Sequence, residues 1–170
     1  MTNTLTTSRM SGSLGAELHD TQLAELDDAG FEALCEQLWE HQILLVRNQR
    51  LTPDQHVEFG RRFGELHHHP RYNKDGLAEI LYIRNIGKAK TVTEVWHSDV
   101  SCEQRPPSIS ILHAVDVPAV GGDTMWADQY AAFESLSDTM KSIVEPLNAI
   151  HEAYGMTSTC LLYTSPSPRD

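Results

Sequence analysis

A histidine and an aspartate stand two positions apart in the middle of the chain, at His97 and Asp99. The alternating apolar residues around them predict a strand over Val95–Val100, and residues i and i+2 of a strand point to the same face. An imidazole nitrogen and a carboxylate oxygen would then face one point, as do two of the three ligands of a 2-His-1-carboxylate iron site. The spacing predicts a metal site, with a simple His–Asp hydrogen bond at a strand end as the alternative.

Further motifs surround this pair in a fixed order. The segments are RFGELHHHP at 62–70, WHSDVS at 96–101, RPP at 105–107 and GGDTMWA at 121–127. Together they resemble the taurine dioxygenase (TauD/TfdA) family of Fe(II)/2-oxoglutarate-dependent dioxygenases, and the resemblance runs from about Leu14 to Tyr154. It implies that His97 and Asp99 are catalytic metal ligands, that the metal is Fe(II) and that 2-oxoglutarate is the cosubstrate.

The same resemblance assigns roles to three further residues. Thr124 corresponds to a contact with 2-oxoglutarate, and its hydroxyl can donate to a carboxylate; an ordinary strand threonine is the alternative. His69 and Tyr72 match the family's substrate segment and are expected to bind the substrate. His67 and His68 are expected at the surface, because neighbours in an extended chain point in opposite directions and cannot easily share one ion.

The chain lacks two residues that the resemblance requires. This family takes its second metal histidine from a strand near the C-terminus, and an arginine beyond that histidine holds 2-oxoglutarate. After Asp99 the sequence has only His113 and His151, and after Arg105 it has only Arg169. None of these lies in a matching context, and His113 falls in an apolar segment that reads as a core strand. The chain therefore resembles the N-terminal part of a longer enzyme.

The hydrophobic pattern predicts an α+β protein. Helices are expected at Asp28–Glu40, from Thr52 to about Gly64, and from Ser137 to about Val144; strands are expected at 43–46, 80–84, 95–100, 108–115 and 123–127. The resemblance implies a double-stranded β-helix (jelly roll, cupin-like) with flanking helices, which here lacks its C-terminal strands. Residues 1–13 are expected to be disordered, 14–156 to form the domain, and 157–170 to be a non-native or disordered tail, because CLLYTSPSPRD resembles translated adaptor sequence.

Composition excludes several classes of protein. The net charge of −11 argues against a nucleic-acid surface, and no apolar run approaches the length of about 18 residues that suggests a membrane span. The N-terminus has no apolar core of a secretory signal, and the three cysteines are sparse and odd in number. We therefore expect a cytoplasmic protein with no nucleic-acid or membrane partner, and the sequence leaves a homo-oligomer open.

The resemblance implies a dioxygenase that uses O2 to hydroxylate a small organic acid or sulfonate-like anion. Thr93 stands where taurine-specific members carry an asparagine, which points away from taurine itself. Two alternatives remain for the chain as given. It can be a non-catalytic truncated fragment, because a metal ligand and the cosubstrate arginine are missing, or a zinc-dependent hydrolase, because zinc also accepts histidine and carboxylate ligands.

Overall fold

The computed structural model describes residues 5–68, 79–83, 96–151 and 163–165. The chain divides into two compact units. The first contains residues 1–62 and 113–135, and the second contains residues 63–112 and 136–170. Among the described residues, no helix is both long enough and apolar enough to cross a membrane.

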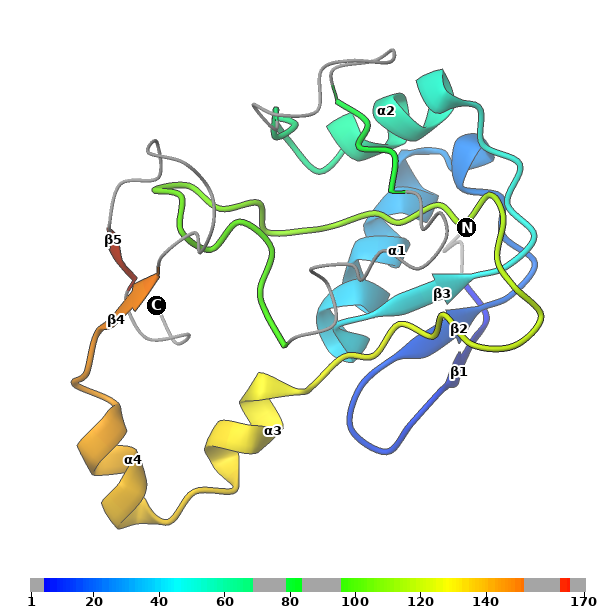
Figure 1. Ribbon diagram of the computed structural model, residues 1–170. Helices are drawn as coiled ribbons and strands as arrows, with labels where there is room; N and C mark the ends of the chain where they lie inside the picture. The colour runs from blue at the N-terminus through cyan, green and yellow to red at the C-terminus, as the bar shows by residue number, and fades with distance from the viewer. Residues whose placement is uncertain (1–4, 69–78, 84–95, 152–162, 166–170) are drawn as a thin grey trace. The chain divides into compact units, whose positions relative to one another are not determined.

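A three-stranded sheet organises the first unit (Figure 1). Strand β1 (Thr7–Arg9) pairs antiparallel with β2 (Ala16–Leu18), and β2 pairs parallel with β3 (Leu44–Val46). Parallel neighbours require a crossover, which here contains a short 3-10 helix (Leu23–Glu25) and helix α1 (Asp28–His41). Residues 1–13 were expected to be disordered, whereas residues 7–9 form strand β1.

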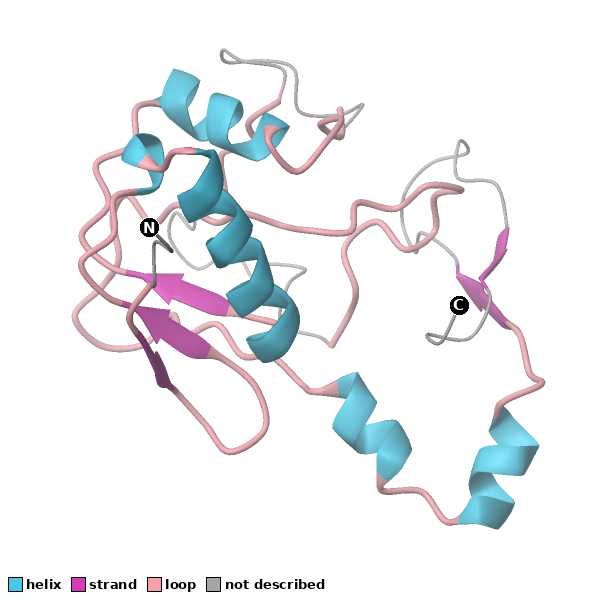
Figure 2. Ribbon diagram, turned by 180° about the vertical axis from the view of Figure 1, so that it is seen from behind, coloured by secondary structure: helices cyan, strands magenta, loops and turns pink. Residues whose placement is uncertain are grey.

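Helix α1 begins and ends where its capping residues dictate. The Asp27 side chain accepts a hydrogen bond from the Gly30 backbone N–H at 2.8 Å, and Gln42 ends the helix in the left-handed conformation. The predicted helix is therefore confirmed. Figure 2 shows α1 lying across one face of the sheet, with Leu34 buried. The apolar residues of α1 recur at helical spacing, at Phe31, Leu34, Cys35, Leu38 and Trp39, which predicts one buried stripe. Trp39 is nevertheless 64% exposed, because it lies about 80° around the helix from Phe31, at the edge of that stripe.

Helix α2 (Pro53–Arg61) starts with the predicted capping box. The Gln55 backbone N–H donates to Thr52 Oγ1 at 3.2 Å, and the Thr52 N–H donates to Gln55 Oε1 at 2.9 Å. Val57 and Phe59 are the buried apolar residues of this helix. The helix ends three residues before Gly64, which was expected as its stop.

Arg62 joins the end of α2 to the start of α1. Its guanidinium donates to the Leu26 carbonyl at 2.6 Å and to Asp28 Oδ1 at 2.9 Å, and it lies 4.3 Å from the centre of the Phe31 ring. The side chain is only 23% exposed. The planar guanidinium of Arg62 thus binds a carbonyl and a carboxylate at the start of α1 and also stacks on an aromatic ring. Lysine cannot reproduce this combination.

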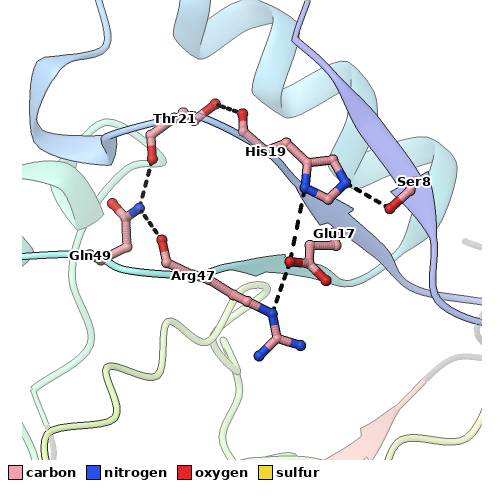
Figure 3. A network of polar contacts seen from close by, with 6 residues as sticks. All are labelled: Ser8, Glu17, His19, Thr21, Arg47 and Gln49. Atoms are coloured by element: carbon pink, nitrogen blue, oxygen red, sulfur yellow. Dashed lines mark hydrogen bonds and ion pairs between the residues drawn. The ribbon is translucent and has the colours of Figure 1, made fainter.

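A polar network ties together the segments that follow β2 and β3 (Figure 3). Gln49 Nε2 donates to the carbonyls of Thr21 and Arg47 at 2.7 and 2.9 Å, and Gln49 Oε1 accepts from the Leu23 N–H at 2.9 Å. Arg47 Nε also pairs with Glu17 Oε1 at 2.8 Å across the parallel strands. The three Gln49 bonds satisfy backbone groups beside the sheet.

Two short helices and two short strands complete the described elements beyond β3 and α2. Helix α3 (Gln129–Glu134) belongs to the first unit and was not predicted, although Asp128 caps it by accepting from the Ala131 N–H at 2.9 Å. In the second unit, α4 (Asp138–Val144) begins after Ser137 as predicted. Strand β4 (Ala149–His151) pairs antiparallel with β5 (Tyr163–Ser165), which lies inside the segment expected to be a non-native tail.

The strands predicted for the middle of the chain are not formed in its described parts. Residues 80–83, 96–100, 108–115 and 123–127 belong to no sheet. Within 108–112, exposure still alternates, with Ile109 and Ile111 half-buried and Ser108, Ser110 and Leu112 exposed. A strand needs a neighbouring strand to pair with its backbone N–H and C=O groups. Among the described residues, these extended segments pair with no neighbouring strand. The structure is therefore a mixed α/β protein in which one extended segment, 108–112, keeps a strand-like alternation.

Candidate metal site

His97 and Asp99 face one another in the second unit. His97 Nε2 lies 3.3 Å from Asp99 Oδ1, and the two side chains are 44% and 57% exposed. They do not belong to a strand as predicted, because a turn begins at Asp99 and continues through residue 102. The pair that the spacing predicted is thus brought together by a turn instead of a strand face.

The two facing atoms suit one metal ion. Two ligand atoms that sit at right angles about 2.1 Å from a metal lie about 3 Å apart, which is close to the observed 3.3 Å. A neutral imidazole nitrogen and an ionised carboxylate are also the donor types of a 2-His-1-carboxylate iron site. In the part of the chain that the structure describes, no group of three His, Cys, Asp or Glu side chains could hold an ion. These residues therefore offer two ligands of such a site.

The turn that carries Asp99 is anchored on both sides. Ser110 Oγ donates to Asp99 Oδ2 at 3.0 Å, and the Glu103 N–H donates to the Val100 carbonyl at 3.0 Å. His67 Nε2 pairs with Glu103 Oε2 at 2.9 Å, next to this turn. His67 was expected at the surface, whereas its side chain is half-buried. Neither Ser110 nor Glu103 could be recognised from the sequence as a residue that supports the site. The one sequence feature of Ser110 is that a hydroxyl side chain alternates with apolar residues in the segment 108–112.

Cys102 lies in the same turn. It is 7% exposed, and its sulfur is in no disulfide. Its burial fits a small apolar residue that fixes the turn, the more common role of a buried cysteine. The other described free thiol is Cys35 of α1, whose pKa is raised chiefly by burial.

Thr124 lies on an extended segment of the first unit and is exposed. Gly121 and Gly122, which precede it, have φ angles of 81° and 77°. This left-handed backbone explains why glycines stand at these two positions. The role of Thr124 toward 2-oxoglutarate stays a prediction. His69 and Tyr72, the predicted substrate residues, lie outside the described residues, as does Thr93.

The two later histidines occupy ordinary structural positions. The His113 ring packs edge-on against the His56 ring of α2, with centres 5.9 Å apart. His151 ends strand β4. Among the described residues, neither joins His97 and Asp99 in a three-ligand group.

Comparison with known proteins shows the family. The family model "Taurine catabolism dioxygenase TauD, TfdA family" matches residues 6–167. An alpha-ketoglutarate-dependent sulfonate dioxygenase of Saccharomyces cerevisiae is 32% identical over 160 residues, covering 85% of this chain and 38% of that protein. An alpha-ketoglutarate-dependent sulfate ester dioxygenase of Pseudomonas putida is 34% identical over 145 residues, covering 84% and 48%.

A solved structure agrees with these matches. The crystal structure of a taurine dioxygenase from Burkholderia xenovorans superposes with a TM-score of 0.82 at 31% identity, over 96% of this chain and 58% of that one. The chain spans about half the length of the curated relatives it matches. Since the family model covers nearly the whole chain, from β1 through β5, the chain belongs to the TauD/TfdA family of dioxygenases.

Proposed function

We propose that this chain supplies the first two metal ligands of an Fe(II)/2-oxoglutarate-dependent dioxygenase that hydroxylates a small organic acid or sulfonate-like anion. The observation that carries the proposal is the 3.3 Å approach of His97 Nε2 to Asp99 Oδ1 within a chain of this family. Relatives are named for sulfonates, sulfate esters and (S)-phenoxypropionate. All three substrate types carry an anionic group on a small carbon skeleton, which is why we propose that class.

Each residue of the proposed site has a defined task. When bound, Fe(II) and 2-oxoglutarate supply the oxidising chemistry, in which O2 and 2-oxoglutarate yield succinate, CO2 and the hydroxylated substrate. His97 holds the metal through Nε2, so its proton must reside on Nδ1, and Asp99 contributes the negative charge. Thr124 donates to a carboxylate of 2-oxoglutarate, while His69 and Tyr72 orient the substrate anion.

The remaining parts of the proposal concern the whole enzyme. Residues 14–156 form the N-terminal part of its jelly-roll domain. The family resemblance implies a second metal histidine and a cosubstrate arginine, which a chain of the relatives' full length would supply. We place the enzyme in the cytoplasm, where free thiols such as Cys35 and Cys102 are normally kept reduced.

A second candidate is a non-catalytic chain that associates through exposed apolar surface. Large apolar side chains are exposed along residues 115–126 of the first unit, including Val115, Val120 and Met125 at 86%, 90% and 72%. Soluble monomers rarely expose so many such side chains in a continuous stretch. The exposed residues fit either a partner surface or the packing surface of a larger jelly roll.

The proposed activity is tested by succinate release. An enzyme that extends this chain to the length of its relatives is incubated with Fe(II), ascorbate and 2-oxoglutarate, together with alkyl sulfonates, alkyl sulfates or aryloxyalkanoates. We expect succinate to form in step with O2 consumption for at least one of these anions. An enzyme that binds Fe(II) and 2-oxoglutarate but turns over only uncharged compounds contradicts the substrate class.

Thr124→Val removes one hydroxyl and keeps the shape of the side chain. Losing a hydrogen bond to a charged group costs about 1.5–3 kcal/mol, so we expect the KM for 2-oxoglutarate to rise about ten-fold or more. The affinity for Fe(II) should stay the same. Thr139→Val, a change at another exposed threonine in α4, is the matched control. An unchanged KM in the Thr124 variant would mean that Thr124 only supports the extended segment.

A further inference from the structure

We propose that Ser110 is a positioning residue that holds the Asp99 carboxylate in its metal-binding orientation. This inference rests on the proposed function, because it concerns the same site. It is carried by contacts of Asp99 that the family resemblance did not assign. The two oxygens of this carboxylate have different partners: Oδ1 faces His97 Nε2 at 3.3 Å, and Oδ2 accepts from Ser110 Oγ at 3.0 Å.

This division of partners holds the Asp99 side chain in one rotamer. An exposed aspartate can exchange between staggered rotamers about its Cα–Cβ bond, and the two contacts of Asp99 are made together in the rotamer observed here. The Ser110 hydroxyl engages one oxygen and leaves the other beside His97. Ligating carboxylates in metalloproteins are commonly oriented by such outer hydrogen bonds, whose loss lowers metal affinity. Ser110 thus keeps the carboxylate of Asp99 turned toward His97 and the proposed metal position.

The backbone of the turn explains why such an outer contact is needed. Val100 has a φ of +49°, a left-handed conformation that a β-branched residue rarely adopts. Strained backbone of this kind persists only where its surroundings hold it. The Ser110–Asp99 bond holds the turn on one side, and the Glu103–His67 pair holds it on the other. Ser110 therefore acts at the point where Asp99 is attached to a strained turn.

The chain offers closely matched variants for a test. Ser110→Ala removes the donor, and Ser110→Thr restores a hydroxyl at the same position. Ser108→Ala makes the same change two residues earlier, at another exposed serine of the same segment. All are made in the full 170-residue chain, so that the surrounding contacts are kept.

The first measurement is the binding of Mn(II), followed by loss of the free Mn(II) signal in electron paramagnetic resonance. We expect Ser110→Ala to raise the dissociation constant about ten-fold or more, in line with the loss of an outer hydrogen bond to a ligand. Ser110→Thr and Ser108→Ala should bind as the unchanged chain does. If Ser110→Ala also binds equally well, the inference is overturned.

The second measurement needs no metal. Three-bond NMR couplings of the Asp99 side chain should show one rotamer in the unchanged chain and in Ser110→Thr, and averaged rotamers in Ser110→Ala. Averaged couplings in the unchanged chain would overturn the positioning role. If the unchanged chain binds no Mn(II) up to millimolar concentration, two protein ligands do not hold the ion without the third, and the couplings then decide whether Ser110 orients Asp99.

Discussion

Asp99→Ala abolishes succinate release in an enzyme of the relatives' length and weakens its Fe(II) binding by more than about 100-fold. This is the expected result because Asp99 supplies the one anionic ligand of the proposed triad. The loss of a first ligand should exceed the 10–100-fold that outer partners typically contribute. Anaerobic Fe(II) titration measures the binding, and succinate formation measures turnover.

Asp116→Ala provides the control for this change. Asp116 is also an exposed aspartate, but it belongs to the first unit and to none of the motifs around the metal pair. Its replacement should leave the Fe(II) affinity and the rate of succinate formation within about two-fold of their starting values, as is usual for exposed positions. An Asp99→Ala enzyme that keeps near-normal turnover would show that Asp99 is not a ligand.

Leu18→Ala lowers the free energy of unfolding of the first unit by about 2–5 kcal/mol. Leu18 is the large side chain most completely buried among the described residues, at 2% exposure, and it lies on the central strand β2. Removing three buried carbon atoms from this strand leaves a cavity that rigid neighbours cannot fill. Urea unfolding of the 170-residue chain, followed by far-UV circular dichroism, measures the change.

Leu112→Ala is the matched control for the Leu18 variant. Leu112 is 65% exposed, so its truncation removes little buried surface. The urea midpoint should then move little, because most exposed substitutions stay within about 0.5 kcal/mol. Equal losses of stability in the two variants would contradict the placement of the core in the first unit.

The helices were the most predictable part of this fold. The starts of α1, α2 and α4 were predicted within a residue of their caps Asp27, Thr52 and Ser137, because a helix start depends on a few adjacent residues. The same signal at Asp128 marks α3, which was overlooked. Trp39 shows the limit of periodicity, since the edge of an apolar stripe is buried only if a neighbour extends far enough to cover it.

The strands were less predictable because each one depends on a distant partner. Strand β1 has the sequence Thr-Ser-Arg, which carries no apolar alternation, and it forms by pairing with β2. The extended segment 108–112 alternates between exposed and half-buried side chains but pairs with no neighbouring strand among the described residues. Arg62 was read as part of a substrate motif, whereas its contacts with Leu26 and Asp28 are structural. Such long-range contacts leave no local pattern.

The site was predictable in its residues but not in its geometry. The His97–Asp99 spacing identified the two facing side chains, although a turn brings them together and not a strand. Ser110 could not be assigned from sequence, because the direction of its hydroxyl depends on how the segments 96–102 and 108–112 approach one another.

The early position of the core in the chain has a consequence for synthesis. Apart from Cys102, every buried apolar side chain of the described residues lies between residues 16 and 59. At about 5–20 residues per second, a ribosome needs about 2–8 s to travel from residue 59 to residue 97. Many small domains fold within milliseconds to seconds. The scaffold of sheet and helices can therefore leave the ribosomal exit tunnel and begin to fold before the metal-binding residues emerge.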